Sequence, residues 1–295
     1  MSPRDARRCA LAGLVSLLLA AGPTGCTRGG DASSSDSPAT TPSDAASSSP
    51  APSRSLEPST RVLPRPRVGD CRVLDFADTN GVLTDAGAKP VACKDDHTAQ
   101  TFAAGPLTDA TALDPQTDPE GVAEALSRDC RAALVDWLGA DEAAYELSMF
   151  AYVVAVPSTS QAAAGAAWYR CDTFAAERGG ELAALPPTTQ RALRGDGAPR
   201  WATCVDGGLN AEPDQVLCTL RHDWRAISAH RLGDRADPFP GDRQVTGEAR
   251  TRCETDVTAW VDDPLVAFDY GWLRPASVDW QQGQRFLLCF ARTPT

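Results

Sequence analysis

The sequence has none of the short motifs that mark the commonest hydrolase and nucleotide sites. It contains no H-E-x-x-H, no G-x-S-x-G and no P-loop, which argues against a zinc metalloprotease, a nucleophile-elbow hydrolase and a P-loop nucleotidase. No two cysteines form a C-x-x-C pair, which argues against thioredoxin-like redox chemistry. We therefore expect a protein that is not an enzyme and has no cofactor.

Lysine is also scarce. Lys89 and Lys94 are the only lysines, and the formal net charge is -11. A chain this acidic is poorly suited to holding nucleic acid or an anionic bilayer surface through its overall charge. We therefore expect no nucleic-acid partner.

The N-terminal apolar run is too short to cross a bilayer, which takes about 20 residues. This run, Ala10–Ala21, follows the positive residues Arg4, Arg7 and Arg8. A positive segment followed by a short apolar one is typical of an export signal. The sequence therefore predicts a signal peptide over residues 1–25.

Cys26 follows Gly25 at the end of that apolar run, and a polar tract begins at Thr27. This arrangement resembles the lipobox of bacterial lipoproteins, although Pro23 stands where that pattern usually has leucine. The resemblance implies that the Cys26 thiol carries a diacylglycerol and anchors the chain at the extracytoplasmic face of the cell membrane. The alternative is plain secretion without a lipid.

The segment 26–66 consists mostly of Ser, Pro, Ala, Thr and Asp. Such a composition buries too little apolar surface to offset its ordering entropy. We expect a disordered linker with a root-mean-square reach of roughly 35 Å.

The chain has ten cysteines. Cys9 lies in the predicted signal and Cys26 is the predicted lipid site. The others form an even set, which in an exported protein indicates disulfides: Cys71, Cys93, Cys130, Cys171, Cys204, Cys218, Cys253 and Cys289.

These cysteines fall into two sets with matching surroundings, which indicates a duplication. In each set a V-x-C precedes a histidine at the same spacing, His97 in one and His222 in the other. A later cysteine precedes Trp137 in one set and Trp260 in the other, again at equal spacing. Proline, glycine, an aromatic and cysteine then recur at equal separations, at 157, 165, 168 and 171 and at 275, 283, 286 and 289. We expect repeat unit 1 over residues 67–180 and repeat unit 2 over residues 198–295.

Each unit shows the same predicted elements. One strand carries the first cysteine, a second ends in V-x-C, and a third follows the histidine. Apolar residues recur at spacings of three and four in the next segment of each unit, which predicts a helix. The predicted helices cover 119–139 and 244–261, and the later strands cover 149–156, 167–174, 265–273 and 285–291. The fold class is α+β: two tandem copies of a small antiparallel sheet with one packed helix, stapled by disulfides.

Four cysteines allow three pairings in each unit, and the local pairing is our prediction. It gives Cys71–Cys93 and Cys204–Cys218 between neighbouring strands. It gives Cys130–Cys171 and Cys253–Cys289 between each helix and the last strand.

His97 and His222 both lie beside carboxylates, in Asp95-Asp96-His97 and His222-Asp223. This could indicate a general base or a metal ligand. We favour a structural role, in which each histidine bonds a loop next to the first disulfide, because no nucleophile is repeated beside it. Zinc is disfavoured because all eight cysteines can pair, and we predict no metal site.

The aromatic residues offer a further candidate surface. Trp137 and Trp260 lie on the apolar faces of their predicted helices, and we expect both in the core. The C-terminal group of Phe268, Tyr270, Trp272 and Trp280 could form a carbohydrate or peptide platform. Packing between the two units is the interpretation that we prefer.

The ordered motifs together resemble the septum-formation-related domain of actinobacterial envelope proteins. These are V-G-D-C at Val68–Cys71, V-x-C with its histidine, a helical cysteine, and the final proline-to-cysteine pattern, over most of residues 67–292. The second unit departs from this with Ala202-Thr203-Cys204. The resemblance implies an exported or membrane-tethered protein with a role in septum formation, and it supplies no catalytic residue.

Our leading hypothesis is an exported, membrane-tethered, non-enzymatic envelope protein. It would be a binding or scaffold module for a protein or a cell-wall component, with a role in septum formation or cell-wall growth. The alternative is an envelope-polymer hydrolase that uses His97 or His222 with nearby carboxylates. A small-molecule binder with a deep apolar pocket between the units is a third hypothesis.

Overall fold

The computed structural model describes residues 65–79, 81–85, 89–107, 117–210, 212–261 and 267–293. All of them belong to one compact unit of the chain, Glu57–Thr295. The predicted signal peptide, the lipid site Cys26 and nearly all of the predicted linker lie outside the described residues. Within the described ranges, no helix has the length and apolarity that a membrane crossing requires.

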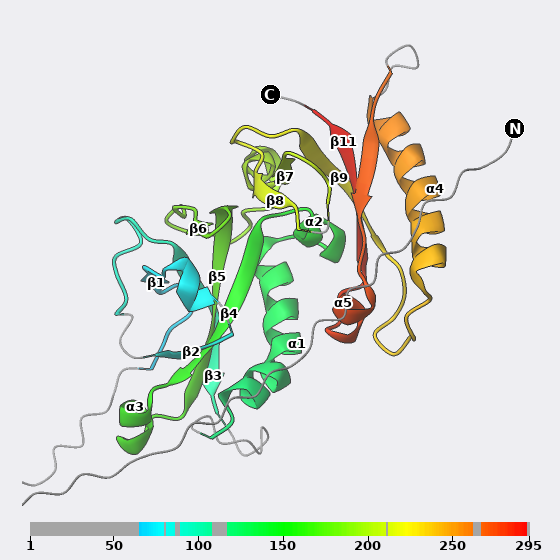
Figure 1. The fold of residues 1–295 in the computed structure, drawn as a ribbon. Coiled ribbons are helices and arrows are strands. Elements are labelled where there is room, and N and C mark those ends of the chain that lie inside the picture. The colour runs from blue at the N-terminus through cyan, green and yellow to red at the C-terminus, as the bar shows by residue number, and fades with distance from the viewer. Residues whose placement is uncertain are drawn as a thin grey trace, which may run out of the picture. The chain divides into compact units, whose positions relative to one another are not determined.

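Two β-sheets, each with a long helix along it, make up the described fold (Figure 1). The strand order is β1-β3-β5-β4-β2 in the first sheet, where β6 also pairs with β5, and β10-β11-β9-β7-β8 in the second. The first sheet contains β1 (Cys71–Arg72), β2 (Val82–Asp85), β3 (Ala99–Pro106), β4 (Phe150–Pro157), β5 (Trp168–Arg178) and β6 (Glu181–Leu182). The second contains β7 (Thr203–Asp206), β8 (Asp214–Leu217), β9 (Trp224–Arg231), β10 (Tyr270–Leu273) and β11 (Phe286–Arg292). The α+β prediction with two sheet copies is confirmed.

The two sheets repeat one topology. Strands β1, β3, β5 and β4 are neighbours in that order, and β7, β9, β11 and β10 are neighbours in the same order, with antiparallel pairing throughout. The short helices α3 (Thr159–Ala163) and α5 (Ser277–Gln281) occupy equivalent places before β5 and β11. Each is followed by a glycine with positive φ, 88° at Gly165 and 93° at Gly283. The repeated glycine therefore has a backbone cause, because most other residues are strained at such angles.

Capping residues set the ends of the first long helix, and one apolar face of each long helix packs against its sheet. Helix α1 (Pro119–Leu138) follows Asp118, whose side chain accepts a hydrogen bond from the Gly121 amide, and it ends at Gly139 in the left-handed conformation. These are favourable helix boundaries. Helix α4 (Asp242–Val261) buries Val245, Ala249, Cys253 and Val257 against its sheet. Helix α1 buries Val122, Leu126, Cys130, Leu134 and Leu138 in the same way.

The described residues contain four disulfides, and these are the four predicted pairs. Cys71–Cys93 and Cys204–Cys218 close the first loop of each unit, with sequence separations of 22 and 14. Cys130–Cys171 joins α1 to β5, and Cys253–Cys289 joins α4 to β11. Each unit therefore has one bridge at the sheet edge and one between helix and sheet.

Unit 1 differs from the prediction at its first loop. Val91 forms only an isolated bridge with Cys71, so no full strand ends at Cys93. Strand β2, from the same loop, instead pairs parallel to β4 at the far edge of the sheet. The longer loop lets the chain reach that edge, whereas the shorter loop of unit 2 forms β8 as a direct antiparallel neighbour of β7.

The predicted positions of the aromatic residues need two corrections. Trp137 is half-buried, with its Nε1–H donating to Thr189 Oγ1 at 2.8 Å. Trp260 is 48% exposed, so its placement in the core was wrong. Trp260 follows Val257 by three residues and so shares its face of α4, but it lies one residue from the end of the helix at Val261. Its exposure therefore reflects what packs over the helix end and not the helix face.

The C-terminal aromatics pack within unit 2 rather than between the units. Tyr270 and Trp272 contact the core of Ala249, Cys253, Leu287 and Cys289. Trp280 is buried and donates its indole N–H to the Asp237 carbonyl at 2.8 Å. These rings therefore stabilise unit 2.

Backbone hydrogen bonds join the two units directly. The Met149 amide donates to the Trp201 carbonyl at 2.8 Å, and the Thr203 amide donates to the Leu147 carbonyl at 2.9 Å. The buried ring of Trp201 lies 4.7 Å from that of Phe150, between centroids. These contacts fix the start of β7 beside the start of β4.

Candidate binding groove

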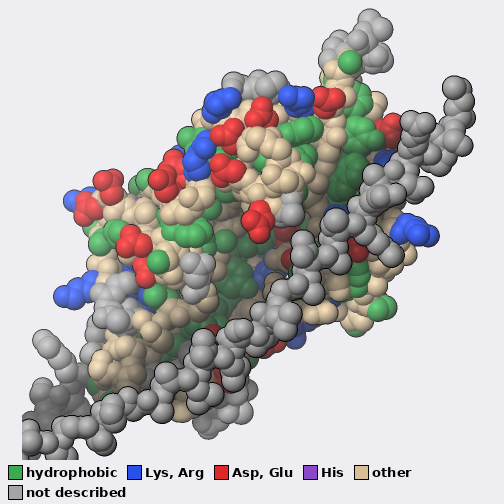
Figure 2. Space-filling model, viewed as in Figure 1, with side chains coloured by type: hydrophobic (Ala, Val, Ile, Leu, Met, Phe, Trp, Pro, Cys, Tyr) green, Lys and Arg blue, Asp and Glu red, His purple; other side chains and the backbone are tan. Residues whose placement is uncertain are grey.

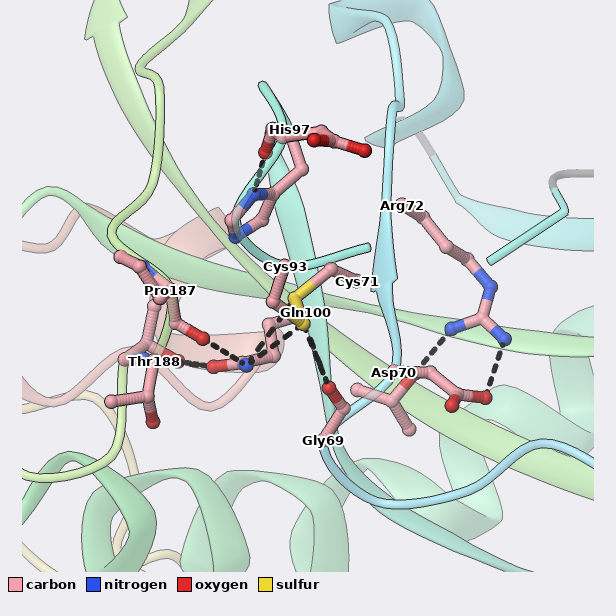
Figure 3. The surroundings of a disulfide bond; sticks show 12 residues. Gly69, Asp70, Cys71, Arg72, Cys93, His97, Gln100, Pro187 and Thr188 are labelled. Carbon is pink, nitrogen blue, oxygen red and sulfur yellow. Dashed lines mark hydrogen bonds and ion pairs between the residues drawn. A yellow bond between two sulfur atoms is a disulfide. The ribbon is translucent and has the colours of Figure 1, made fainter. Parts of the chain in front are cut away.

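His97 lies in a buried environment beside the disulfide Cys71–Cys93 (Figure 3). Its Nδ1 lies 2.8 Å from the Asp95 carbonyl oxygen, and its Nε2 lies 3.1 Å from that of Pro186. The side chain is 2% exposed. Both ring nitrogens thus contact backbone carbonyls, as expected for a structural histidine.

His222 repeats the arrangement in unit 2. It is buried, and its Nδ1 lies 2.7 Å from the carbonyl oxygen of Leu220. Leu220 precedes His222 by two residues, just as Asp95 precedes His97 by two residues. The neighbouring Asp223 carboxylate accepts from the Gly207 amide at 2.8 Å. The prediction that each histidine bonds a loop is confirmed.

A polar cluster in unit 2 was missed by the sequence analysis. Ser228 and His230, two residues apart on one face of β9, both hydrogen-bond Asp256 of α4. Burial alone would raise the pKa of Asp256, but these hydrogen bonds and the charge of His230 outweigh it, so the pKa lies below its ordinary value. Successive side chains of a strand point to opposite faces of the sheet, so the sequence could have placed Ser228 and His230 on the same face.

This cluster lacks the geometry of a catalytic triad. The Ser228 hydroxyl donates to the carboxylate, while the His230 ring is 3.5 Å away. A triad serine instead bonds the imidazole that takes its proton. The nearby Cys289 sulfur belongs to a disulfide, so it offers no thiolate for a metal ion.

A groove between the two units is the candidate site that the described residues form. One hollow of about 580 Å³ lies between α1, the short helix α2 (Glu142–Glu146) and β4 on one side and β9 and the turn from α5 into β11 on the other. A second hollow of about 440 Å³ shares Ala151, Gln284 and Phe286 with it. We call the two together the inter-unit groove. On the face seen in Figure 2, hydrophobic side chains are visible at the bottom of a recess near the middle of the molecule.

The larger hollow is lined by polar and aromatic side chains rather than by an apolar surface. Five arginines and two glutamates contribute to it, namely Arg128, Arg131, Arg231, Arg235, Arg285, Glu124 and Glu142. The larger hollow is therefore not the deep apolar pocket that would favour a small-molecule binder.

Some of these charges are already neutralised. Arg131 pairs with Glu146 and lies 5.0 Å from the Tyr145 ring centroid. Arg231 pairs with Glu142 at 2.6 Å across the units. Arg285 is buried and donates to backbone carbonyls, including that of Arg235 at 3.0 Å.

Two tyrosines line the larger hollow, Tyr145 of α2 and Tyr152 of β4. Burial raises the pKa of Tyr145 and of Tyr152, and the charge of Arg131 only partly offsets this. Both phenols therefore stay protonated at neutral pH. The Tyr152 hydroxyl donates to the Ser127 carbonyl at 2.9 Å.

The fold and the groove together define a duplicated, disulfide-stapled α+β protein with buried structural histidines. Residues 68–289 match the model of the family described as Septum formation, and the chain belongs to that family. No curated protein matches the chain, and no solved structure does.

Proposed function

We propose that this septum-formation protein is exported, tethered to the membrane through a lipid on Cys26, and works by binding rather than by catalysis. Its partner is an envelope protein or a cell-wall component. The inter-unit groove carries the proposal, since it offers exposed binding groups from both units.

The settings of the two histidines support binding over hydrolysis. A general base needs a free ring nitrogen within reach of the substrate proton. His97 is buried with both nitrogens against carbonyls, and His222 is buried with Nδ1 against one. Neither histidine lines the inter-unit groove.

The anchor and the folded part have separate tasks in this proposal. A lipid on Cys26 holds the chain at the membrane, and the predicted linker lets the folded units reach away from it. In cells, a Cys26→Ser variant should leave the membrane fraction and lose the mobility shift of the lipid. Unchanged fractionation and mobility would contradict the tether.

Complementation of a septation defect tests the non-enzymatic role. His97→Ala and His222→Ala chains should restore septation in proportion to the folded protein present, which thermal unfolding of the purified variants measures. A folded variant that is abundant in the envelope but inactive would favour the hydrolase hypothesis instead.

A further inference from the structure

The inter-unit groove has two exposed arginine side chains with which no described residue pairs. Arg128 of α1 and Arg235 after β9 are exposed and line the larger hollow. Among the described residues, neither side chain makes a hydrogen bond or an ion pair, whereas the side chains of Arg131 and Arg231 do. One comes from each unit, so an anion that engages both would contact both units.

This local positive charge is unusual for the molecule. The whole chain has a formal net charge of -11, yet arginines outnumber glutamates in this hollow. An anionic ligand is repelled by the negative net charge of the chain and attracted by these arginines. The guanidinium group is suited to carboxylate and phosphate because it presents paired donors in a fixed plane.

The remaining lining groups indicate the rest of the ligand. Gln281, Gln282 and Gln284 are exposed at the turn before β11, and Phe286 follows them. Amides both donate to and accept from hydroxyl groups, and an aromatic ring packs against an apolar face. Sugars offer both features, and the second hollow extends the surface beyond one sugar ring.

We propose that the inter-unit groove binds an anionic glycan strand, meaning a polymer of hydroxyl-bearing units with phosphate or carboxylate groups. This inference rests on the proposed binding function and names its ligand class. Arg128 and Arg235 hold the anionic groups, and the glutamines at 281, 282 and 284 contact hydroxyls.

The test uses the oxidised mature chain and defined polymers in calorimetric titrations. The probes are phosphomannan (a mannose polymer that carries phosphate groups), polygalacturonate, neutral dextran and poly-glutamate. We expect at least one of the first two to bind, more weakly as salt rises, and dextran and poly-glutamate to bind at least about tenfold more weakly. The stronger of the two anionic glycans identifies phosphate or carboxylate as the preferred group.

Matched variants locate the site. R128Q/R235Q should weaken binding by about tenfold or more, because each arginine loses a charge-assisted hydrogen bond. R221Q/R250Q removes the same charge from exposed arginines outside the groove and should change affinity by less than about twofold. Both pairs are exposed, and unfolding curves check that the variants fold.

Three results would overturn the glycan inference: equal binding of poly-glutamate, binding of dextran as strong as that of the anionic glycans, or equal losses in the two double variants. Failure to bind any glycan, with a septal protein still crosslinked to the chain in cells, removes the ligand class and leaves the proposed function standing. Absence of any envelope partner in cells removes both.

Discussion

The two units share a strand order, a helix-to-sheet disulfide and a buried histidine. They differ in the segment that packs against the C-terminal end of the long helix. In unit 1 the segment after β6 returns to the end of α1, where the Arg191 and Leu193 amides donate to the Trp137 and Leu138 carbonyls. In unit 2 the equivalent Trp260 is half-exposed. The same duplicated sheet and helix therefore accept different segments packed over the helix end. The inter-unit groove forms where unit 1 and unit 2 face each other.

The disulfides should show the largest effects on stability. A bridge restricts the unfolded chain more when it closes a longer loop, and the separations are 41 for Cys130–Cys171 and 14 for Cys204–Cys218. Replacing both cysteines by serine should lower the free energy of unfolding by about 4 kcal/mol for the first bridge and about 3 kcal/mol for the second. Denaturant unfolding measures both. A larger loss at Cys204–Cys218 would contradict this ranking.

The equivalent tryptophans test the comparison of the helix ends. Trp137→Ala should cost about 2 kcal/mol, since it empties a half-buried site and leaves Thr189 without the indole donor. Trp260→Ala should cost less, about 0.5 kcal/mol, because 48% of this residue is already exposed. Equal losses in the free energy of unfolding, measured in urea, would mean that the two tryptophans are packed equally well and would contradict this comparison.

Asp256 gives unit 2 a pH dependence through its cluster with Ser228 and His230. The folded-state pKa is lowered, so the stabilisation is full above the unfolded value of about 3.9 and is lost as pH falls through the folded pKa. Asp256→Asn should cost about 1 kcal/mol at pH 7. The difference from wild type should shrink below about pH 4, and a constant difference down to pH 2 would contradict the assignment.

The ion pair of Arg231 with Glu142, one of those that cross between the units, should have the smallest effect. Arg231 and Glu142 are about half-exposed, at 41% and 47%. A double-mutant cycle with Arg231→Gln and Glu142→Gln should give a coupling of less than about 1 kcal/mol that fades with salt. A coupling above about 2 kcal/mol would show that this pair, rather than the backbone contacts near Trp201, joins the units.

Much of the fold was predictable because the constraints are local and occur twice. The cysteine spacings, the period of α1 and the glycines after α3 and α5 each reflect a nearby requirement. The parallel pairing of β2 was not predictable, since Val82–Asp85 is short and its partner lies far along the chain. The exposure of Trp260 depends on what packs over a helix end, which the periodicity does not report.

The candidate site was less predictable than the fold. Arg128 and Arg235 are remote in sequence and come from different units, so no motif links them. Ser228, His230 and Asp256 meet only because β9 packs against α4. The structural role of His97 and His222 was predictable, because duplication without a repeated nucleophile favours architecture over catalysis.

Photocrosslinking in growing cells tests the central claim that the inter-unit groove is the binding surface. A diazirine residue replaces Gln282 in the groove or, as a control, Ala259 on the exposed side of α4. The account predicts that position 282 captures envelope material, that position 259 does not, and that R128Q/R235Q reduces the capture. Equal capture at both positions, or capture unaffected by R128Q/R235Q, would contradict it.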